Sequence, residues 1–266
     1  AGHLRGCGAG GDFGFVQEVF FTDENVKPFL QIQNLSKNFG GFTALDKVEV
    51  AVGKGERFGL IGPNGSGKTT LINCISGALF NDSGRILFNG EEISRLPAYQ
   101  RTRRGIARSF QIPRPFGSMS VLENLVVPLE YVVHRGSLHT ADTEAEAMEI
   151  LKGMGLADKA GVRASSLSQV ELRKMELARA MAARPRLLIS DEAMAGLSGN
   201  EISEVLEILF KLNASGITII MIEHIMQAVM KFSQRIICLD AGQIICEGTP
   251  ESIVQDPGVQ RAYLGA

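Results

Sequence analysis

A nine-residue glycine-rich segment constrains this chain more than any other feature. It reads Gly62-Pro63-Asn64-Gly65-Ser66-Gly67-Lys68-Thr69-Thr70 and fits the phosphate-binding pattern G-x-x-x-x-G-K-[ST]. An apolar run, 58–61, precedes it, and apolar residues at helical spacing follow it. Strand, glycine loop and helix are the context that this motif requires, whereas a flexible glycine-rich turn would need neither flank. The sequence therefore predicts a nucleotide-binding P-loop.

The residue types in this segment suit a phosphate. Glycines let backbone N–H groups turn inward without a clashing Cβ and form a concave anion site. The helix that follows directs its positive N-terminal end at the same point. Lys68 adds a mobile positive charge for the outer phosphates, and the Thr69 hydroxyl is a ligand for Mg²⁺.

Composition narrows the class of protein. The chain has 266 residues and a formal net charge of -2, with acidic and basic residues interspersed. Because no basic stripe is present, a nucleic-acid surface is not supported. The longest apolar runs, such as 217–222, are far too short to cross a bilayer. Any work at a membrane is therefore expected to go through a partner.

The chain divides into an extension and one large domain. Residues 1–27 are glycine-rich and irregular and lack the pattern of a signal peptide, so we treat them as an N-terminal extension. Residues 28–266 are expected to form the domain, with a small helical subdomain inserted at about 112–180. No internal repeat is found, which indicates a single nucleotide-binding unit.

The pattern of elements predicts an α/β fold. Residues 30–35 and 47–52 alternate apolar and polar side chains, which is typical of half-buried strands in an antiparallel sheet. Strands and helices then alternate from residue 187 onward, and 235–246 is expected to form a hairpin. Alternation of this kind favours a mostly parallel sheet flanked by helices, with ligand at the carboxyl ends of its strands. The predicted fold is thus a P-loop cassette with an added antiparallel β subdomain and the helical subdomain.

Two apolar strands end in polar residues that suit phosphate chemistry. The run 187–190 ends in Asp191 and Glu192, where Asp191 is expected to hold Mg²⁺ and Glu192 to orient or deprotonate the attacking water. A strand that merely ends in a polar turn is the alternative. The run 217–222 leads to His224, which is placed to donate a hydrogen bond to the γ-phosphate. A histidine with only a structural role is the alternative there.

Several further segments accompany these motifs along the chain. In order, the set is the P-loop, Arg108-Ser109-Phe110-Gln111, Val121-Leu122-Glu123-Asn124-Leu125, Leu167-Ser168, Asp191-Glu192, Ile222-Glu223-His224, Gly248-Thr249-Pro250 and Ala262-Tyr263-Leu264-Gly265. Together these segments resemble those of an ATP-binding-cassette (ABC) transporter ATPase subunit, over roughly residues 30–265. The resemblance is closer to the subfamily that powers branched-chain amino-acid importers.

The resemblance implies further roles. Phe39 matches the aromatic residue that stacks on adenine, although ordinary core packing is the alternative for it. Gln111 matches the glutamine that reaches Mg²⁺ and senses the membrane subunit. In this family two cassettes close head to tail around two ATP molecules, and Ser168 matches the signature serine that contacts the ATP of the other subunit.

The resemblance also implies partners and a location. The implied ligands are ATP and Mg²⁺, and the implied partners are transmembrane permease subunits and a second ATPase subunit, identical or different. The implied location is peripheral, on the cytoplasmic face of the inner (plasma) membrane. The implied function is ATP hydrolysis that powers import of branched-chain or other hydrophobic amino acids.

The signature segment departs from the family pattern. Leu-Ser-Gly-Gly-Gln is expected, but Val170 replaces the second glycine and Glu171 replaces the glutamine. A β-branched side chain should hold a phosphate off, and a carboxylate adds negative charge beside it. The alternative function is therefore a cassette that binds ATP and dimerises with little hydrolysis. In a heterodimer with a consensus partner, the ATP on this chain's P-loop would be the one hydrolysed.

Overall fold

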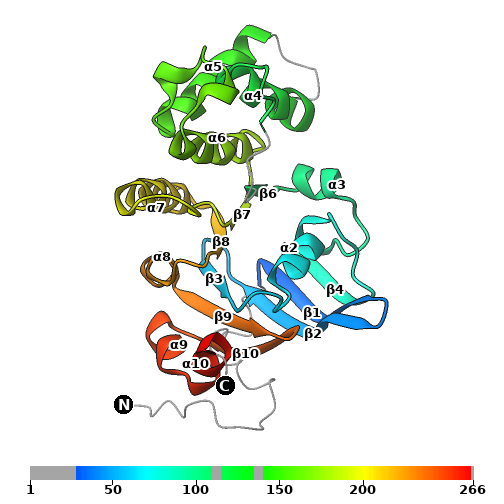
Figure 1. Ribbon diagram of the computed structural model, residues 1–266. Helices are drawn as coiled ribbons and strands as arrows, with labels where there is room; N and C mark the ends of the chain where they lie inside the picture. The colour runs from blue at the N-terminus through cyan, green and yellow to red at the C-terminus, as the bar shows by residue number, and fades with distance from the viewer. Residues whose placement is uncertain (1–27, 110–114, 135–139, 265–266) are drawn as a thin grey trace.

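The computed structural model describes residues 28–109, 115–134 and 140–264 (Figure 1). The extension 1–27 and Gln111 therefore lie outside the described residues. Two sheets and a cluster of helices make up the described part. None of the described helices combines the length and the apolar character needed to span a bilayer.

The larger sheet is six-stranded and carries the P-loop. Its strand order is β10-β9-β3-β8-β7-β6, in which β10 pairs antiparallel with β9 and all other neighbours are parallel. The strands are β3 (Arg57–Ile61), β6 (Ile106–Ser109), β7 (Leu187–Asp191), β8 (Thr218–Ile222), β9 (Arg235–Asp240) and β10 (Gln243–Gly248). This order places β8 directly between the P-loop strand and the strand that ends in Asp191.

The smaller sheet is antiparallel, with the order β2-β1-β4-β5. Its strands are β1 (Leu30–Phe39), β2 (Phe42–Val52), β4 (Ser83–Phe88) and β5 (Glu91–Glu92). β1 and β2 extend further than the alternating pattern predicts, so that Phe39 pairs with Phe42 at the tip of the hairpin. The antiparallel subdomain predicted from the sequence is confirmed.

Helices cover the sheets and form a separate cluster. In Figure 1 the cluster of α4, α5 and α6 lies at the top, away from the four-stranded sheet. The helices are α2 (Lys68–Ser76), α3 (Ala98–Arg103), α4 (Val121–Pro128), the π-helix η1 (Leu129–His134), α5 (Thr140–Gly153), the 3₁₀ turns η2 (Ala157–Lys159) and η3 (Ala164–Ser166), α6 (Gln169–Ala182), α7 (Gly199–Ala214), α8 (Met226–Phe232), α9 (Pro250–Gln255) and α10 (Pro257–Leu264). The fold class expected from the sequence is confirmed.

One helix differs from its sequence pattern. The spacing predicts a continuous helix over 121–133, but α4 ends at Pro128 and continues as a π-helix. Proline lacks an amide hydrogen and its ring crowds the preceding turn, so the regular hydrogen-bond ladder is interrupted there. Hydrophobic spacing alone does not reveal such a change of helix type.

The large sheet is buried on both faces, which explains its apolar strands. Leu188 and Ile219 point into a core shared with the helices α4 to α8. Ile189 and Ile220, their neighbours along the same strands, point into a second core shared with α2 and the small sheet. A parallel sheet covered on both faces needs apolar side chains at consecutive positions, as the sequence runs show.

The β9–β10 hairpin forms one edge of the large sheet. Its turn residues, Ala241 and Gly242, both have positive φ angles, 46° and 80°. Two such residues between paired strands are typical of a tight hairpin turn whose twist matches the strands. The hairpin predicted over 235–246 is confirmed, and it lies beside the P-loop, where the Gly242 N–H donates to the Ser66 carbonyl at 2.9 Å.

Candidate functional site

The P-loop joins the end of β3 to the start of α2. Gly67 occupies the N-cap position of α2 with φ 107°, a conformation that favours glycine. A Cβ there would lie 2.6 Å from the Ala44 carbonyl oxygen. Gly62 has φ 150°, and a Cβ on it would overlap the Leu239 carbonyl oxygen. Both glycines are therefore required for the loop to pass between its neighbours.

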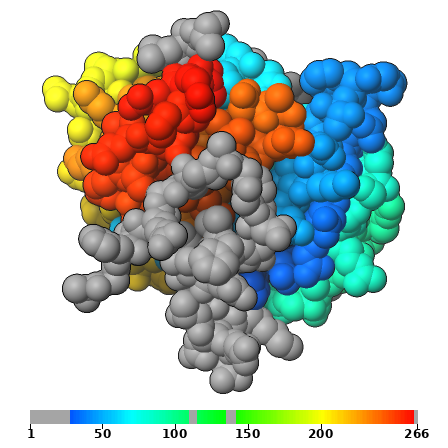
Figure 2. All heavy atoms as spheres, turned by 90° about the horizontal axis from the view of Figure 1, so that it is seen from below, coloured from blue at the N-terminus to red at the C-terminus, as the bar shows by residue number. Residues whose placement is uncertain are grey.

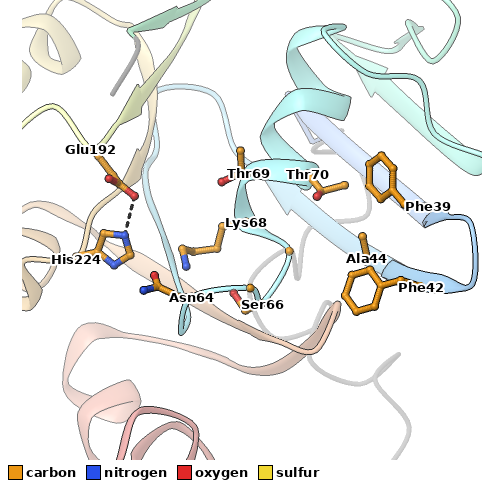
Figure 3. Close-up of a pocket in the computed structure, with 12 residues that line it drawn as sticks. Phe39, Phe42, Ala44, Asn64, Ser66, Lys68, Thr69, Thr70, Glu192 and His224 are labelled. Atoms are coloured by element: carbon orange, nitrogen blue, oxygen red, sulfur yellow. Dashed lines mark hydrogen bonds and ion pairs between the residues drawn. The ribbon is translucent and has the colours of Figure 1, made fainter. Parts of the chain in front are cut away.

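A cavity of about 290 Å³ lies over this loop (Figure 3). In Figure 3 the P-loop residues lie between Glu192 and His224 on one side and Phe39, Phe42 and Ala44 on the other. The lining residues are Phe39, Phe42, Ala44, Asn64, Gly65, Ser66, Gly67, Lys68, Thr69, Thr70, Glu192 and His224. Segments far apart in the sequence thus meet around one phosphate-binding loop. Of the described residues that the sequence analysis assigned to nucleotide or Mg²⁺ binding, Gly62, Pro63, Ser168 and Asp191 lie outside this lining.

Lys68 is held inside the loop. Its Nζ donates to the carbonyl oxygens of Gly62 at 2.7 Å and Pro63 at 2.9 Å. Burial lowers the pKa of the Lys68 ammonium, while the nearby Glu192 carboxylate acts in the opposite direction. A desolvated cation whose hydrogen bonds among the described residues go to neutral carbonyls is well suited to receive a phosphate oxygen, whose full charge stabilises it more.

The surroundings of the Ser66 hydroxyl show whether this cavity fits a phosphate group. Its side chain is 2% exposed, and its Oγ has no hydrogen-bond partner among the residues that the structure describes. A buried hydroxyl without a partner is costly unless a ligand or water satisfies it. Together with Lys68 and the N-terminus of α2, this hydroxyl fits an anionic group in the cavity.

The expected Mg²⁺ ligands lie on different elements. Thr69 is exposed at the start of α2, and Asp191 ends β7. The Asp191 carboxylate accepts two hydrogen bonds from Arg108, at 2.5 and 3.2 Å, and Arg108 also donates to Asn73 Oδ1 at 2.6 Å. The sequence analysis quotes Arg108 in the segment Arg108-Ser109-Phe110-Gln111 but assigns it no role of its own. The hydroxyl and carboxylate oxygens present are the donor types that Mg²⁺ prefers.

Glu192 and His224 meet across two neighbouring strands. β7 and β8 are parallel and pair Asp191 with Ile222, so the residues that follow each strand end side by side. His224 Nε2 lies 2.6 Å from Glu192 Oε1, and the imidazole N–H donates to the carboxylate (dashed line in Figure 3). Glu192 has φ 48°, a left-handed conformation that costs about 1–3 kcal/mol in a residue with a side chain. Strained backbone of this kind is enriched at functional sites.

Glu223 is a buried acid to which the sequence analysis assigned no role. Its side chain is 2% exposed, and its Oε1 accepts a hydrogen bond from the Met194 N–H at 2.9 Å. Burial raises the pKa of this carboxyl to about 7, and the nearby Glu192 carboxylate adds to the effect. It lies directly before His224, and the Glu192 carboxylate that raises its pKa is the one that His224 contacts.

Two aromatic side chains are available at the open side of the cavity. Phe39 is 48% exposed and Phe42 is 61% exposed. Large apolar rings left in solvent at a cavity are explained by a ligand ring better than by core packing. Phe42 was missed because the hairpin tip that carries it extends beyond the alternating pattern.

Ser168 lies away from this cavity, at the N-cap of α6. Its Oγ accepts from the Glu171 N–H at 3.4 Å, and the Ser168 N–H donates to Glu171 Oε2 at 2.8 Å. This capping box turns the Glu171 carboxylate back onto its own helix, where Lys159 also pairs with it at 3.2 Å. The Glu171 carboxylate, which the sequence analysis expects to add negative charge beside a phosphate, is thus held on its own helix and paired with Lys159.

Fold and cavity together define a P-loop nucleotide-binding protein. Sequence comparison narrows the class. The family model described as "ABC transporter" matches residues 45–195. A second model, described as "Branched-chain amino acid ATP-binding cassette transporter", matches residues 243–266. The chain belongs to the ABC transporter family.

Individual relatives agree with this assignment. A protein of Archaeoglobus fulgidus named "Probable branched-chain amino acid transport ATP-binding protein LivG" is 39% identical over 89% of this chain and 95% of its own length. The Escherichia coli K12 protein named "High-affinity branched-chain amino acid transport ATP-binding protein LivG" is 38% identical over 90% and 98%. A crystal structure of a nucleotide-free ATP-binding cassette from an ABC transporter superposes with a TM-score of 0.82. Its sequence is 33% identical, and the match covers 90% of this chain and all of that one.

These findings confirm the family resemblance predicted from the motifs. The chain is an ATP-binding cassette, an ATPase subunit in which ATP hydrolysis is coupled to transport. The P-loop cavity of the structure is the place where the cassette's nucleotide site is expected, and nothing else among the described residues combines a glycine loop, a buried lysine and an unpartnered hydroxyl.

Proposed function

We propose that this chain supplies the energy for uptake of branched-chain or other hydrophobic amino acids. Two observations support the proposal. The curated relatives carry names that refer to branched-chain amino-acid transport. The segment 243–266, which comprises the last strand and the C-terminal helices, matches a model described in the same terms. The second observation carries the proposal, because this segment lies outside the part that matches the general family model.

The proposed chemistry assigns a role to each residue of the cavity. The loop 62–67, Lys68 and Thr70 bind the phosphates of ATP, and Phe39 or Phe42 stacks on adenine. Glu192 accepts the proton of the attacking water, and His224 holds the carboxylate and the terminal phosphate in place. Thr69, Gln111 and Asp191 would hold Mg²⁺, which would supply charge neutralisation at the phosphates.

The proposed membrane partner docks beside the helical cluster. A second cavity, of about 410 Å³, lies between α2, α3 and that cluster and is lined by residues that include Ala98, Phe116, Pro128 and Tyr131. Tyr131 is 72% exposed and Phe116 is 44% exposed. Exposed aromatic side chains around an apolar hollow favour a protein partner over solvent. We assign this surface to a transmembrane permease, which holds the chain peripherally on the cytoplasmic face of the inner membrane.

A second cassette completes the proposed assembly. Ser168 is exposed and lies outside its own chain's cavity, so it is available to the nucleotide of another subunit. The domain division that accompanies this proposal is a cassette over residues 28–266 with a helical subdomain at about 112–180 and an extension at 1–27.

Uptake measurements test the proposed solute. The chromosomal gene for this chain is deleted and replaced with the wild type or with Glu192→Gln, and uptake of labelled leucine, isoleucine and valine is followed. Wild type should restore uptake and the variant should not, while uptake of labelled urea is the matched control. Restored urea uptake with unchanged leucine uptake would contradict the proposed solute class.

A further inference from the structure

The C-terminal helix contacts the P-loop through one hydrogen bond. The Gly62 N–H donates to Tyr263 Oη at 2.8 Å, across 201 residues of sequence. Tyr263 belongs to α10, which lies with α9 at the molecular surface beside β10, in red and orange in Figure 2. The roles given above to the nucleotide-binding residues do not account for a tyrosine at this position of α10.

The bonded residue is the first glycine of the P-loop. Its N–H is taken by Tyr263, and its carbonyl accepts from Lys68 Nζ at 2.7 Å. A Cβ at Gly62 would lie 2.6 Å from Ser66 Oγ, so the peptide has little room to move. Both polar groups of Gly62 are thus held, one by the C-terminal helix and one by the lysine that is to bind phosphate.

The tyrosine is placed with its hydroxyl toward the protein. The side chain is 39% exposed, yet burial raises the pKa of its phenol, and the Gly62 N–H acts in the opposite direction. Gly62 itself is buried, so its N–H depends on this acceptor. A buried amide that loses its acceptor destabilises the conformation that buries it.

We propose that Tyr263 is a positioning residue for nucleotide binding. By accepting from the Gly62 N–H, it fixes the first peptide of the P-loop in the orientation that presents Lys68 and the following amides to the phosphates. The β9–β10 hairpin braces the other end of the loop, through the Gly242 N–H and the Ser66 carbonyl. Movement of α10 is thereby coupled to nucleotide affinity. The inference rests on nucleotide binding by the cassette and is independent of the transported solute.

The test variant removes the Tyr263 hydroxyl, which accepts the hydrogen bond, and keeps the aromatic ring. Tyr263→Phe is compared with wild type and with Tyr99→Phe, which removes the hydroxyl of an exposed tyrosine on α3. The Kd of the purified chain for a fluorescent ATP analogue is measured with and without Mg²⁺. Tyr263→Phe should raise the Kd about three- to tenfold, the effect expected from one neutral hydrogen bond. Tyr99→Phe should leave the Kd unchanged.

Amide hydrogen exchange separates positioning from general stabilisation. In the nucleotide-free chain, the peptide that contains Gly62 should exchange faster in Tyr263→Phe, while peptides from β7 and β8 exchange as in wild type. An unchanged Kd together with unchanged exchange at the P-loop would overturn the proposal. Faster exchange in every core peptide would overturn it too, since the tyrosine would then only support the fold. Loss of leucine uptake plays no part in either readout, so failure of the solute proposal is distinguishable from failure of this one.

Discussion

Glu223→Gln should change how the stability of the protein depends on pH. The Glu223 carboxyl is 2% exposed and its pKa is raised by burial from 4.5 to about 7. A raised pKa means that the folded state binds the proton more tightly than the unfolded chain does. The protonated form therefore stabilises the fold fully below pH 4.5, and this contribution is lost as the pH rises through 7.

The size of the effect follows from the shift. Each pKa unit corresponds to about 1.4 kcal/mol, so ionising Glu223 in the folded state costs about 3 kcal/mol. Glutamine has the same shape and keeps an oxygen that accepts from the Met194 N–H, but it does not titrate. The free energy of unfolding of the variant, relative to wild type, should therefore rise by about 2–3 kcal/mol between pH 5 and pH 8.

Urea unfolding followed by circular dichroism at several pH values measures this difference. Every other titrating group is shared by the two proteins, so the difference between their curves isolates Glu223. Glu207→Gln, an exposed position on α7, is the matched control and should follow wild type at each pH. Parallel curves for wild type and Glu223→Gln would refute the reasoning, because they would show that folding leaves this pKa unchanged.

Three further predictions concern hydrolysis and folding. Glu192→Gln should lower steady-state ATP hydrolysis by about 10²–10⁴-fold and leave the Kd for ATP nearly unchanged, and residual turnover above a tenth of wild type would argue against a proton-accepting role. Arg101→Met should lower the free energy of unfolding, measured in urea, by about 3 kcal/mol, because this fully buried guanidinium donates to backbone carbonyls at the end of α2. A decrease of less than about 1 kcal/mol would contradict this reasoning. Val170→Gly combined with Glu171→Gln should raise ATP turnover in a dimer by up to about 10²-fold. Glu171→Gln alone should have little effect since glutamine can also form the capping box, and unchanged turnover in the double variant would show that the departures are tolerated.

Most of the nucleotide site could be predicted from short stretches of sequence. The P-loop is contiguous, and its spacing directly encodes a strand, an anion-binding turn and a helix. Glu192 and His224 each follow an apolar run that ends abruptly. Such signals are local, since a strand that ends in a polar residue can be recognised without knowing its neighbours in the sheet.

Contacts between distant segments were not predictable in the same way. Nothing near Tyr263 in the sequence indicates that its hydroxyl accepts from Gly62. The pairing of Arg108 with Asp191, and the return of the Glu171 carboxylate onto its own helix beside Lys159, likewise depend on where packed elements come to lie. Glu223 reads as one more polar residue at a strand end until its burial is known.

Most strands and helices, the phosphate-binding loop and the family could be read from residue spacing within single segments, although the change of helix type at Pro128 and the full length of β1 and β2 could not. Which of these segments lie side by side depends on how the whole chain packs. The strand order β3-β8-β7 places the Glu192 and His224 side chains together beside the P-loop. The β9–β10 hairpin and α10 each contact that loop through a hydrogen bond. The physical reason is that the stable sheet order and helix positions are those that bury both faces of the sheet at once. That burial depends on the whole chain and not on any single segment.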